Sequence, residues 1–385
     1  MRVLYLTGMY PTKEYPQKGI FCHEQVKALV RLGIEVTVAV PVPFYSLEMK
    51  KWEYEGICII YVPYFKFPKA FCFQNSGKFL SKAIKKYVSV EEYDIIHAHV
   101  ALPEGQAAML LSEEYHIPYI VTIHSLDVFM DDDYQHYKNC WKIVNSCKNV
   151  YKGANAVTGV SQKVIDRVCQ IESLREKSFV VYNGVDVRKF HPYEGIINES
   201  GFRIVSIGNL VPLKGHDITI KAFSRLVKKG YKDLRLTIYG RGYLQQDLKE
   251  IVAEEGMEDR IDFKGYVPYD LIAEDLPQYD LFVLPSWFEA IGCVYLEAMA
   301  SGVLPIGCLG NGIDEVIVHD YNGWLVRPHN IDDVENIIES AINEKASPKY
   351  LQMRENAICT VVERYTWEKS SQELVKIYEK IKSVL

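Results

Sequence analysis

The sequence predicts an α/β protein built from two doubly wound, mainly parallel-sheet domains. The chain has 385 residues, which is more than one ordinary domain usually holds. Short apolar runs recur along it, and several are followed by a glycine-containing loop and then a helical pattern. This alternation of strand, loop and helix is typical of parallel sheets. Because it occurs in both halves, we expect two such domains facing each other across a cleft.

The first half supplies the elements of one domain. A strand at residues 2–7 precedes a long loop at 8–19, which is rich in Pro, Lys and Gly. A helix is expected from about 20 to 32, and a second from Ser161, a plausible N-cap, to about 169. The remaining strands are expected at 34–40, 93–97, 117–123, 156–160 and 178–182.

A polar, glycine-containing stretch at 184–200 resembles an interdomain linker. We therefore expect an N-terminal domain at 1–184 and a C-terminal domain at 185–366. The amphipathic tail at 367–385 predicts one helix, which we expect to pack back on the N-terminal domain. Strands of the C-terminal domain are expected at 202–207, 234–239, 261–264, 281–284, 303–307 and 323–326.

Composition and charge narrow the class of protein. Hydrophobic residues make up 48% and charged residues 24%, as in globular proteins. The net charge of -6 gives no reason to expect a nucleic-acid partner. No apolar run reaches the ~20 residues that span a bilayer, and the start resembles a first strand more than a secretory signal. Nine cysteines without a C-x-x-C pair favour reduced thiols in a cytoplasmic protein.

Residues 56–90 form a locally basic stretch, with six lysines, eight aromatic residues and no acidic residue. A solvated helix face beside a strand explains this pattern. Alternatively, a surface within 61–87 rests on anionic lipid or meets an anionic acceptor. The sequence leaves both interpretations open.

Several polar residues follow strands of the N-terminal domain, where α/β proteins bind ligands. For His97 and His99 we favour a packed, hydrogen-bonded turn. For His124 we favour a functional role, because Asp127 follows within one turn. The run at 131–133 is Asp-Asp-Asp and could be read as a divalent-metal site, but a solvated acidic helix start explains it, and we expect no metal.

Residues 281–302 organise the C-terminal domain. An apolar strand at 281–284 ends at Pro285 and Ser286, and a helix is expected from about 292 to 300. Such a strand–loop–helix corner binds anions through free backbone N–H groups and the helix dipole. Glu289 precedes the helix and Glu297 lies inside it, so a phosphate at the helix start would lie between them. A sugar nucleotide fits this layout, since it carries sugar hydroxyls, a diphosphate and a ribose diol.

Four motifs surround this corner. They are Gly208-Asn209-Leu210 followed by Lys214-Gly215; Tyr182-Asn183-Gly184-Val185-Asp186; Gly240-x-Gly242; and Pro285-Ser286 leading through Glu289-x7-Glu297 to Ala298-Met299-Ala300-Ser301-Gly302. With them the chain resembles a family 4 glycosyltransferase of the GT-B fold, which has two Rossmann-like domains. The resemblance spans nearly the whole chain and is strongest from 180 to 330.

The resemblance implies retaining transfer of a sugar from a nucleoside diphosphate sugar, mildly favouring a uridine-type donor, without a divalent metal. The acceptor is expected to be a glycan or lipid-linked molecule of cell-surface polysaccharide biosynthesis, and the enzyme cytoplasmic or peripheral at the inner face of the plasma membrane. Catalytic roles are implied for His124, Glu289 and Lys214. Donor binding is implied for Gly19, Asn209, Lys214, Gly240, Val267, Glu289, Ala290, Ile291, Gly292, Cys293, Val294 and Glu297.

The sequence departs from the family pattern at Asn209, where many members have Arg. We hypothesise that Lys18 supplies the missing positive charge. Glu289 could be a nucleophile in a double displacement, but we favour same-face attack with Glu289 as a positioning residue. A sugar-nucleotide epimerase of the same fold is the main alternative, and a non-catalytic binding protein a lesser one. An oxidoreductase is disfavoured because no G-x-G-x-x-G follows the first strand.

Overall fold

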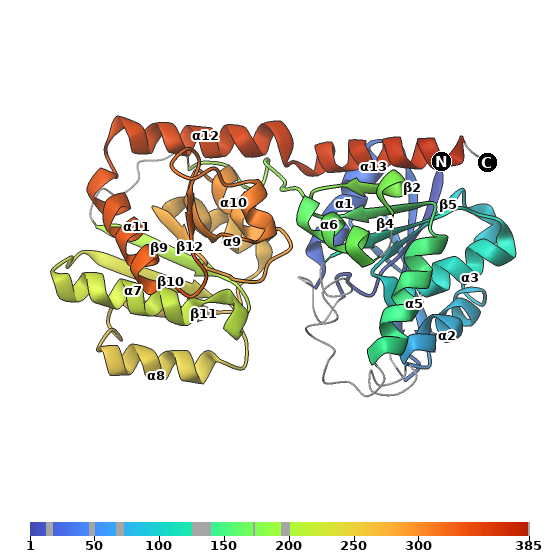
Figure 1. Ribbon diagram of the computed structural model, residues 1–385, viewed down its shortest axis with the longest axis horizontal. Coiled ribbons are helices and arrows are strands. Elements are labelled where there is room, and N and C mark those ends of the chain that lie inside the picture. Colours follow the sequence, from blue (N-terminus) through green and yellow to red (C-terminus); the bar gives the residue numbers. More distant parts are fainter. Residues whose placement is uncertain are drawn as a thin grey trace. The chain divides into compact units, whose positions relative to one another are not determined.

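The computed structural model describes residues 1–12, 18–45, 51–66, 73–124, 140–171, 174–193 and 201–383. The chain forms two compact units, one of Met1–Asn183 with Trp367–Leu385, and the other of Gly184–Thr366 (Figure 1). Each unit has its own sheet, mainly parallel in the first unit and fully parallel in the second, with helices packed on it.

The first unit contains a sheet with strand order β3-β4-β2-β1-β5-β6-β7-β8. All neighbouring strands are parallel except β3 and β4, which are antiparallel. The strands are β1 (Arg2–Leu6), β2 (Glu35–Pro43), β3 (Lys51–Tyr54), β4 (Ile57–Tyr64), β5 (Ile95–His99), β6 (Tyr119–Ile123), β7 (Ala156–Gly159) and β8 (Ser178–Val180). The helices are α1 (Ile20–Arg31), α2 (Ser76–Ile84), α3 (Gln106–Tyr115), α5 (Cys140–Gly153), α6 (Gln162–Ile171) and α13 (Trp367–Lys382).

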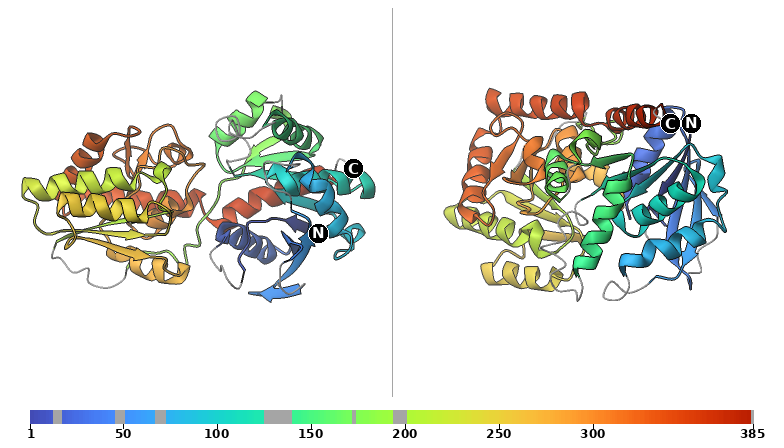
Figure 2. Two further views of the ribbon diagram at one scale, coloured as in Figure 1. Left: turned by 90° about the horizontal axis from the view of Figure 1, so that it is seen from below. Right: turned by 45° about the vertical axis from the view of Figure 1, so that its right-hand side comes forward.

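Helix α13 lies beside α1 and completes the core of the first unit (Figures 1 and 2). Its buried residues Leu374, Ile377, Tyr378 and Ile381 follow the three- and four-residue spacing of one helix face. They pack in one cluster with residues of β1, α1 and β5. The last helix of the chain is therefore part of the first unit.

The second unit contains a fully parallel sheet with strand order β11-β10-β9-β12-β13-β14. The strands are β9 (Phe202–Ile207), β10 (Leu234–Tyr239), β11 (Ile261–Gly265), β12 (Leu281–Val283), β13 (Leu304–Cys308) and β14 (Trp324–Val326). The helices are α7 (His216–Lys229), α8 (Gln245–Glu255), α9 (Tyr269–Asp275), α10 (Cys293–Ala300), α11 (Ile331–Glu344) and α12 (Pro348–Arg364). Two mainly parallel sheets in one chain confirm the predicted fold class.

One prediction about the first unit was wrong. The strand expected at 93–97 runs instead from Ile95 to His99, so His97 and His99 lie within a strand and not in a turn. Both side chains are buried, and His97 bonds Tyr378 of α13 through Nδ1 (2.6 Å) and Thr122 of β6 through Nε2 (2.7 Å). The His97 imidazole, which was expected in a turn, is therefore hydrogen-bonded at both ring nitrogens by neighbouring elements of the core.

The described residues also bear on the expectations for membrane-spanning segments and for cysteines. No helix among them is both long enough and apolar enough to cross a membrane. The cysteines with described side chains are free thiols: Cys22, Cys58, Cys147, Cys169, Cys293, Cys308 and Cys359.

Candidate active site

The predicted strand–loop–helix corner is present in the second unit. Strand β12 ends at Val283 and α10 begins at Cys293, with Gly292 as a left-handed N-cap at φ 73°. No side chain in the described residues caps this helix start. The phenol of Tyr295 donates a hydrogen bond to the carbonyl oxygen of Leu284, which ties the helix to the end of the strand. The N-terminal amide groups of α10 therefore lie at a fixed edge of the sheet.

Lys214 and Glu289 form an ion pair at this edge. Lys214 ends a short 3-10 turn after β9, and its ammonium donates to Oε2 of Glu289 in the loop before α10. Only 17% of the Lys214 side chain and 16% of the Glu289 side chain are exposed. Charges that are largely withdrawn from water interact more strongly than surface pairs. The structure thus joins two residues that are 75 positions apart in the sequence.

The loop after β13 holds Glu289 in place. The Glu289 amide donates to Oδ1 of Asn311 (3.1 Å), and Nδ2 of Asn311 donates to the carbonyl oxygen of Ser286 (3.1 Å). The amide of Gly312 donates to the carbonyl oxygen of Glu289 (3.0 Å). A Cβ on Gly312 would lie 1.5 Å from the carbonyl oxygen of Ala290, so only glycine fits. Sequence reasoning gave Asn311 and Gly312 no role, although a Gly-Asn-Gly loop directly after a strand was the available signal.

Glu297 is buried in α10, with 7% of its surface exposed. Its flanking residues are apolar, and a carboxylate in such surroundings needs a hydrogen-bond partner. The phenol of Tyr269, at the start of α9, donates to Oε1 of Glu297 (3.0 Å). Val267 lies just before α9 in the same connection, partly buried. The hydrogen bond therefore joins the start of α9 to α10 on one side of the corner, and Val267 lies two residues before Tyr269.

The Gly240-x-Gly242 motif has a packing role in the structure. Gly240 follows β10 at φ 134°, and a Cβ there would lie 1.9 Å from the carbonyl oxygen of Gly208. Its amide donates to the carbonyl oxygen of Gly265 (2.8 Å). The glycine therefore lets the loop after β10 press against the loop after β9, which carries the exposed Asn209.

The first unit holds the other predicted site residues. Gly19 is the N-cap of α1, and His124 directly follows β6. Nε2 of His124 lies 2.6 Å from Nδ1 of the buried His99. Burial lowers the pKa of His124 to about 3, so its imidazole is neutral near physiological pH. Burial also lowers the pKa of His97 to about 3, with a smaller contribution from the repulsion that His124 would exert if both rings were protonated.

The predicted residues therefore form two groups, each within one unit. The second unit brings together Lys214, Glu289, Glu297 and the start of α10. The first unit contains Gly19 and His124. Asp127 and the acidic run at 131–133 lie outside the described residues, as do residues 67–72 of the basic stretch.

Comparisons with known proteins cover both units. The family model "Glycosyltransferase Family 4" matches residues 19–189, and "Glycosyl transferases group 1" matches residues 187–360. The uncharacterized glycosyltransferase MJ1607 of Methanocaldococcus jannaschii is 26% identical over 98% of this chain and 98% of its own. A Bacillus subtilis protein named as a teichuronic acid biosynthesis glycosyltransferase, TuaC, is 28% identical over 85% of this chain and 86% of its own.

Solved structures share the fold. Sucrose-phosphate synthase of Thermosynechococcus elongatus superposes with a TM-score of 0.83 over 100% of both chains at 17% identity. Anabaena HepE, crystallised with UDP, superposes with a TM-score of 0.77 over 99% of this chain and 100% of its own at 20% identity. Their fold is the GT-B fold. The two family models adjoin and together extend from residue 19 to residue 360. The chain therefore belongs to glycosyltransferase family 4 and is a nucleotide-sugar-dependent glycosyltransferase of the GT-B fold.

Proposed function

We propose that the second unit binds the nucleoside diphosphate sugar, and that the enzyme transfers the sugar with retention of anomeric configuration. The contact of Lys214 with Glu289 beside the start of α10 carries the proposal, because it places a cation and a hydroxyl-binding carboxylate at an anion-binding helix end. Glu289 would accept hydrogen bonds from sugar hydroxyls, and Glu297, already hydrogen-bonded to Tyr269, would accept them from the ribose diol.

Lys214 and the amides of α10 would stabilise the departing diphosphate. In the reaction the bond from the anomeric carbon to the phosphate oxygen breaks, and an acceptor hydroxyl bonds to the same face of the sugar. Its proton passes to the departing phosphate oxygen. Fixed donors that meet the developing negative charge need no reorganisation at that moment. Because this charge is met by an ammonium and backbone amides, we propose that the reaction needs no divalent metal.

The ion pair also favours a positioning role for Glu289 over a nucleophilic one. A carboxylate oxygen that accepts a hydrogen bond from an ammonium has less free electron density to attack carbon. Same-face attack needs no covalent intermediate on the protein. A glycosyl adduct trapped on Glu289 and found by mass spectrometry would contradict this part of the proposal.

His124 is the site residue that we propose for the first unit. As a neutral imidazole it can donate one hydrogen bond to a sugar hydroxyl without adding charge. A cavity of about 490 Å³ at the carboxyl ends of β2, β4 and β5 is a candidate acceptor pocket. Its lining includes Lys18, Lys66, Tyr64, Phe73 and the buried Glu104. Aromatic and charged groups of both signs suit a polar, glycan-like acceptor.

The acceptor's origin in cell-surface polysaccharide assembly is also a proposal. TuaC, whose name refers to teichuronic acid biosynthesis, is one relative of this chain that supports it. An acceptor carried on lipid would require the enzyme to visit a membrane surface. Helix α2 exposes Lys78, Phe79 and Lys82, and Lys86 follows it. Aromatic side chains beside lysines suit the interface of an anionic bilayer.

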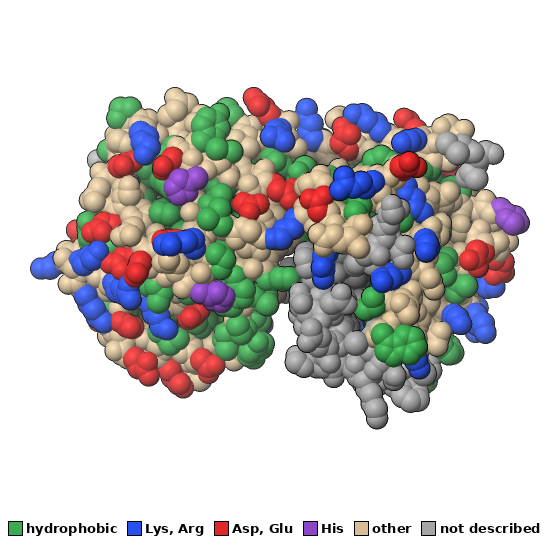
Figure 3. Space-filling model, viewed as in Figure 1, with side chains coloured by type: hydrophobic (Ala, Val, Ile, Leu, Met, Phe, Trp, Pro, Cys, Tyr) green, Lys and Arg blue, Asp and Glu red, His purple; other side chains and the backbone are tan. Residues whose placement is uncertain are grey.

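The membrane contact can be tested directly. Charges of both signs are interspersed on the described surface of each unit in Figure 3, so electrostatic binding would depend on a local group such as the α2 lysines. We expect salt-sensitive sedimentation with anionic vesicles, lost on replacing Lys78, Lys82 and Lys86 by Ala. Lys85→Ala is the matched control, because Glu114 already offsets the Lys85 charge (2.7 Å). Failure of the wild type to sediment at low salt would contradict the contact.

A donor panel tests the proposed reaction. The purified chain is mixed with each nucleoside diphosphate sugar, with and without candidate glycan acceptors, and release of nucleoside diphosphate is measured. We expect release that depends on the acceptor, and an anomeric centre in the product, assigned by NMR, that matches the donor. Conversion of the donor sugar without any acceptor would instead favour the epimerase, which the sequence left as an alternative.

A further inference from the structure

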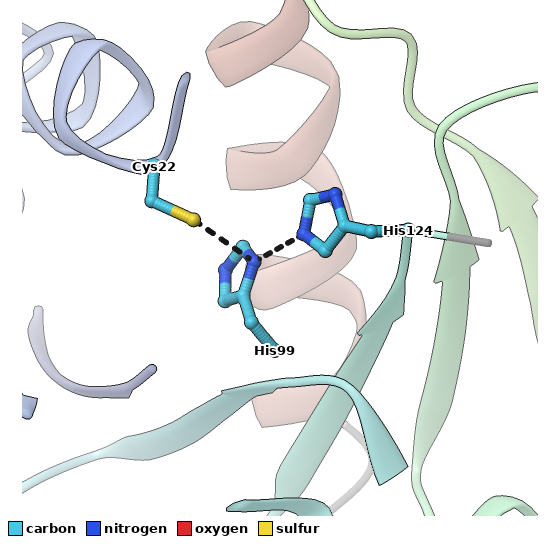
Figure 4. A group of neighbouring side chains, drawn as sticks. All are labelled: Cys22, His99 and His124. Atoms are coloured by element: carbon cyan, nitrogen blue, oxygen red, sulfur yellow. Dashed lines mark hydrogen bonds between the residues drawn. The ribbon is translucent and has the colours of Figure 1, made fainter. Parts of the chain in front are cut away.

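A cysteine and two histidines meet beside the proposed sugar-binding histidine (Figure 4). Cys22 comes from the first turns of α1, His99 ends β5 and His124 follows β6. Nδ1 of His99 lies 3.7 Å from Sγ of Cys22 and 2.6 Å from Nε2 of His124. These three atoms all lie within 4.8 Å of one another. Three separate elements thus direct one sulfur and two ring nitrogens at a single point.

The separations are close to those of a zinc site. With Zn–N of about 2.0–2.1 Å and Zn–S of about 2.3 Å, tetrahedral ligand atoms lie roughly 3.3–3.7 Å apart. The Cys22–His99 distance of 3.7 Å already fits. The 2.6 Å contact between His99 and His124 must widen by about 1 Å. Cys22 and His124, whose ligand atoms lie within 4.8 Å of each other, need to approach by about 1 Å at most. His124 is the partly exposed member and offers a route for an ion, whereas Cys22 and His99 are each 1% exposed.

The surrounding charges also suit a cation. Burial raises the pKa of the Cys22 thiol to about 12, and the carboxylate of Glu104 adds to this rise. The charge of Glu104 therefore acts on the position of Cys22, and the same negative charge would attract a cation bound there. Buried neutral imidazoles are the form in which histidine binds metal. Among the described residues, Nε2 of His99 has no hydrogen-bond partner, so neither ring nitrogen of His99 is committed to a strong acceptor elsewhere.

We propose that Cys22, His99 and His124 form a Zn²⁺ site that inhibits the enzyme by capturing His124. Binding exchanges the proton of the Cys22 thiol for a sulfur–zinc bond and releases that proton to solvent. Without metal, one of the two facing ring nitrogens of His99 and His124 donates the hydrogen bond between them. In the metal-bound form that imidazole carries its proton on its other ring nitrogen, so that both facing nitrogens bind the ion. The fourth position remains open to water. The metal site stands on this geometry alone, whereas the inhibition rests on the proposed role of His124.

Cobalt reports the site without any enzyme assay. The metal-stripped chain is titrated with Co²⁺, and we expect a near-ultraviolet thiolate-to-cobalt band that saturates at one equivalent. Cys22→Ser keeps the size of the side chain but should lose the band and weaken binding at least about 100-fold. Cys359→Ser, which alters an exposed cysteine of the other unit, is the matched control and should keep the band. Absence of the band from the wild type overturns the site, whether or not Cys22→Ser folds.

Zinc inhibition is then measured as nucleoside diphosphate release. We expect one equivalent of Zn²⁺ to remove most turnover, a chelator to restore it, and Cys22→Ser to turn over normally and resist zinc. Equal inhibition of Cys22→Ser and wild type would place the effect elsewhere and overturn the proposal. A cobalt band without zinc inhibition would overturn the regulatory role of the site. If no donor is turned over at all, the proposed function fails, while the cobalt band still decides the metal site.

Discussion

Replacing Lys214 by Ala should damage both turnover and stability, and the two effects can be separated. Loss of one fixed group that stabilises developing charge typically raises the barrier by about 3–4 kcal/mol, roughly a hundred- to thousandfold in kcat. The same change leaves the Glu289 carboxylate, which is 16% exposed, without its ammonium. An uncompensated, largely buried acceptor costs about 1–3 kcal/mol of the free energy of unfolding.

A second substitution separates the two effects. In Lys214→Ala/Glu289→Gln the charge of residue 289 is removed as well, so most of the lost unfolding free energy should return. The kcat should not return, because the positive charge for the diphosphate is still absent. Unfolding is followed in urea and turnover as nucleoside diphosphate release. Lys232→Ala, an exposed lysine of the same unit, is the control. Turnover of Lys214→Ala within about threefold of wild type would refute the reasoning.

Three other changes have definite expectations. Glu297→Gln should raise the KM for the donor about 10- to 100-fold, because the ribose hydroxyls lose a charged hydrogen-bond acceptor. An unchanged KM would show that Glu297 does not bind the donor. Gly312→Ala should lower kcat at least about tenfold, because the new Cβ would displace the carbonyl group of Ala290, the residue after Glu289. A kcat equal to that of the wild type would show that the loop tolerates this displacement. His97 has a pKa of about 3, below its ordinary value, so the unfolded chain binds the extra proton. This residue alone should lower the free energy of unfolding by about 1.4 kcal/mol per pH unit as the pH drops from about 6.5 toward 3. His97→Gln should flatten this slope in urea titrations at several pH values, and an unaltered slope would contradict the assignment.

The sequence was most informative where local patterns decide the structure. The apolar run at 281–284 and the glycine at 292 predicted a strand and a helix start, because both are set by neighbouring residues. The α/β class followed from the repetition of such units. The end of β5 was misplaced because His97 and His99 look polar in sequence. His97 is covered by a hydrogen-bonded contact with Tyr378, which lies 281 positions away in the sequence.

The candidate site shows the same division between local and distant determinants. Glu289 and Lys214 were each found from their motifs, but nothing in the sequence between them, 75 positions from one to the other, indicates that they touch. Asn311 was missed for a related reason, since its two hydrogen bonds to the loop before α10 depend on β12 and β13 being neighbours. Contacts made across a sheet depend on which strands are neighbours, and no single sequence motif determines that strand order.

The two glutamates of the corner show how such distant contacts give one residue type two roles. Glu297 is held by a neutral phenol, which can remain in place when ribose hydroxyls bind. Glu289 is held by the ammonium that we assign to the diphosphate. If Lys214 turns toward the diphosphate, Glu289 loses its partner and its oxygens become available to sugar hydroxyls. Binding of the two halves of the donor is then coupled through one ion pair, so a nucleoside diphosphate without sugar would leave the Glu289 carboxylate uncompensated. Glu289→Gln should therefore bind free nucleoside diphosphate more tightly than the wild type, while binding the intact donor more weakly. Isothermal titration with both ligands measures this difference directly. An unchanged affinity of Glu289→Gln for free nucleoside diphosphate would show that the two halves bind independently.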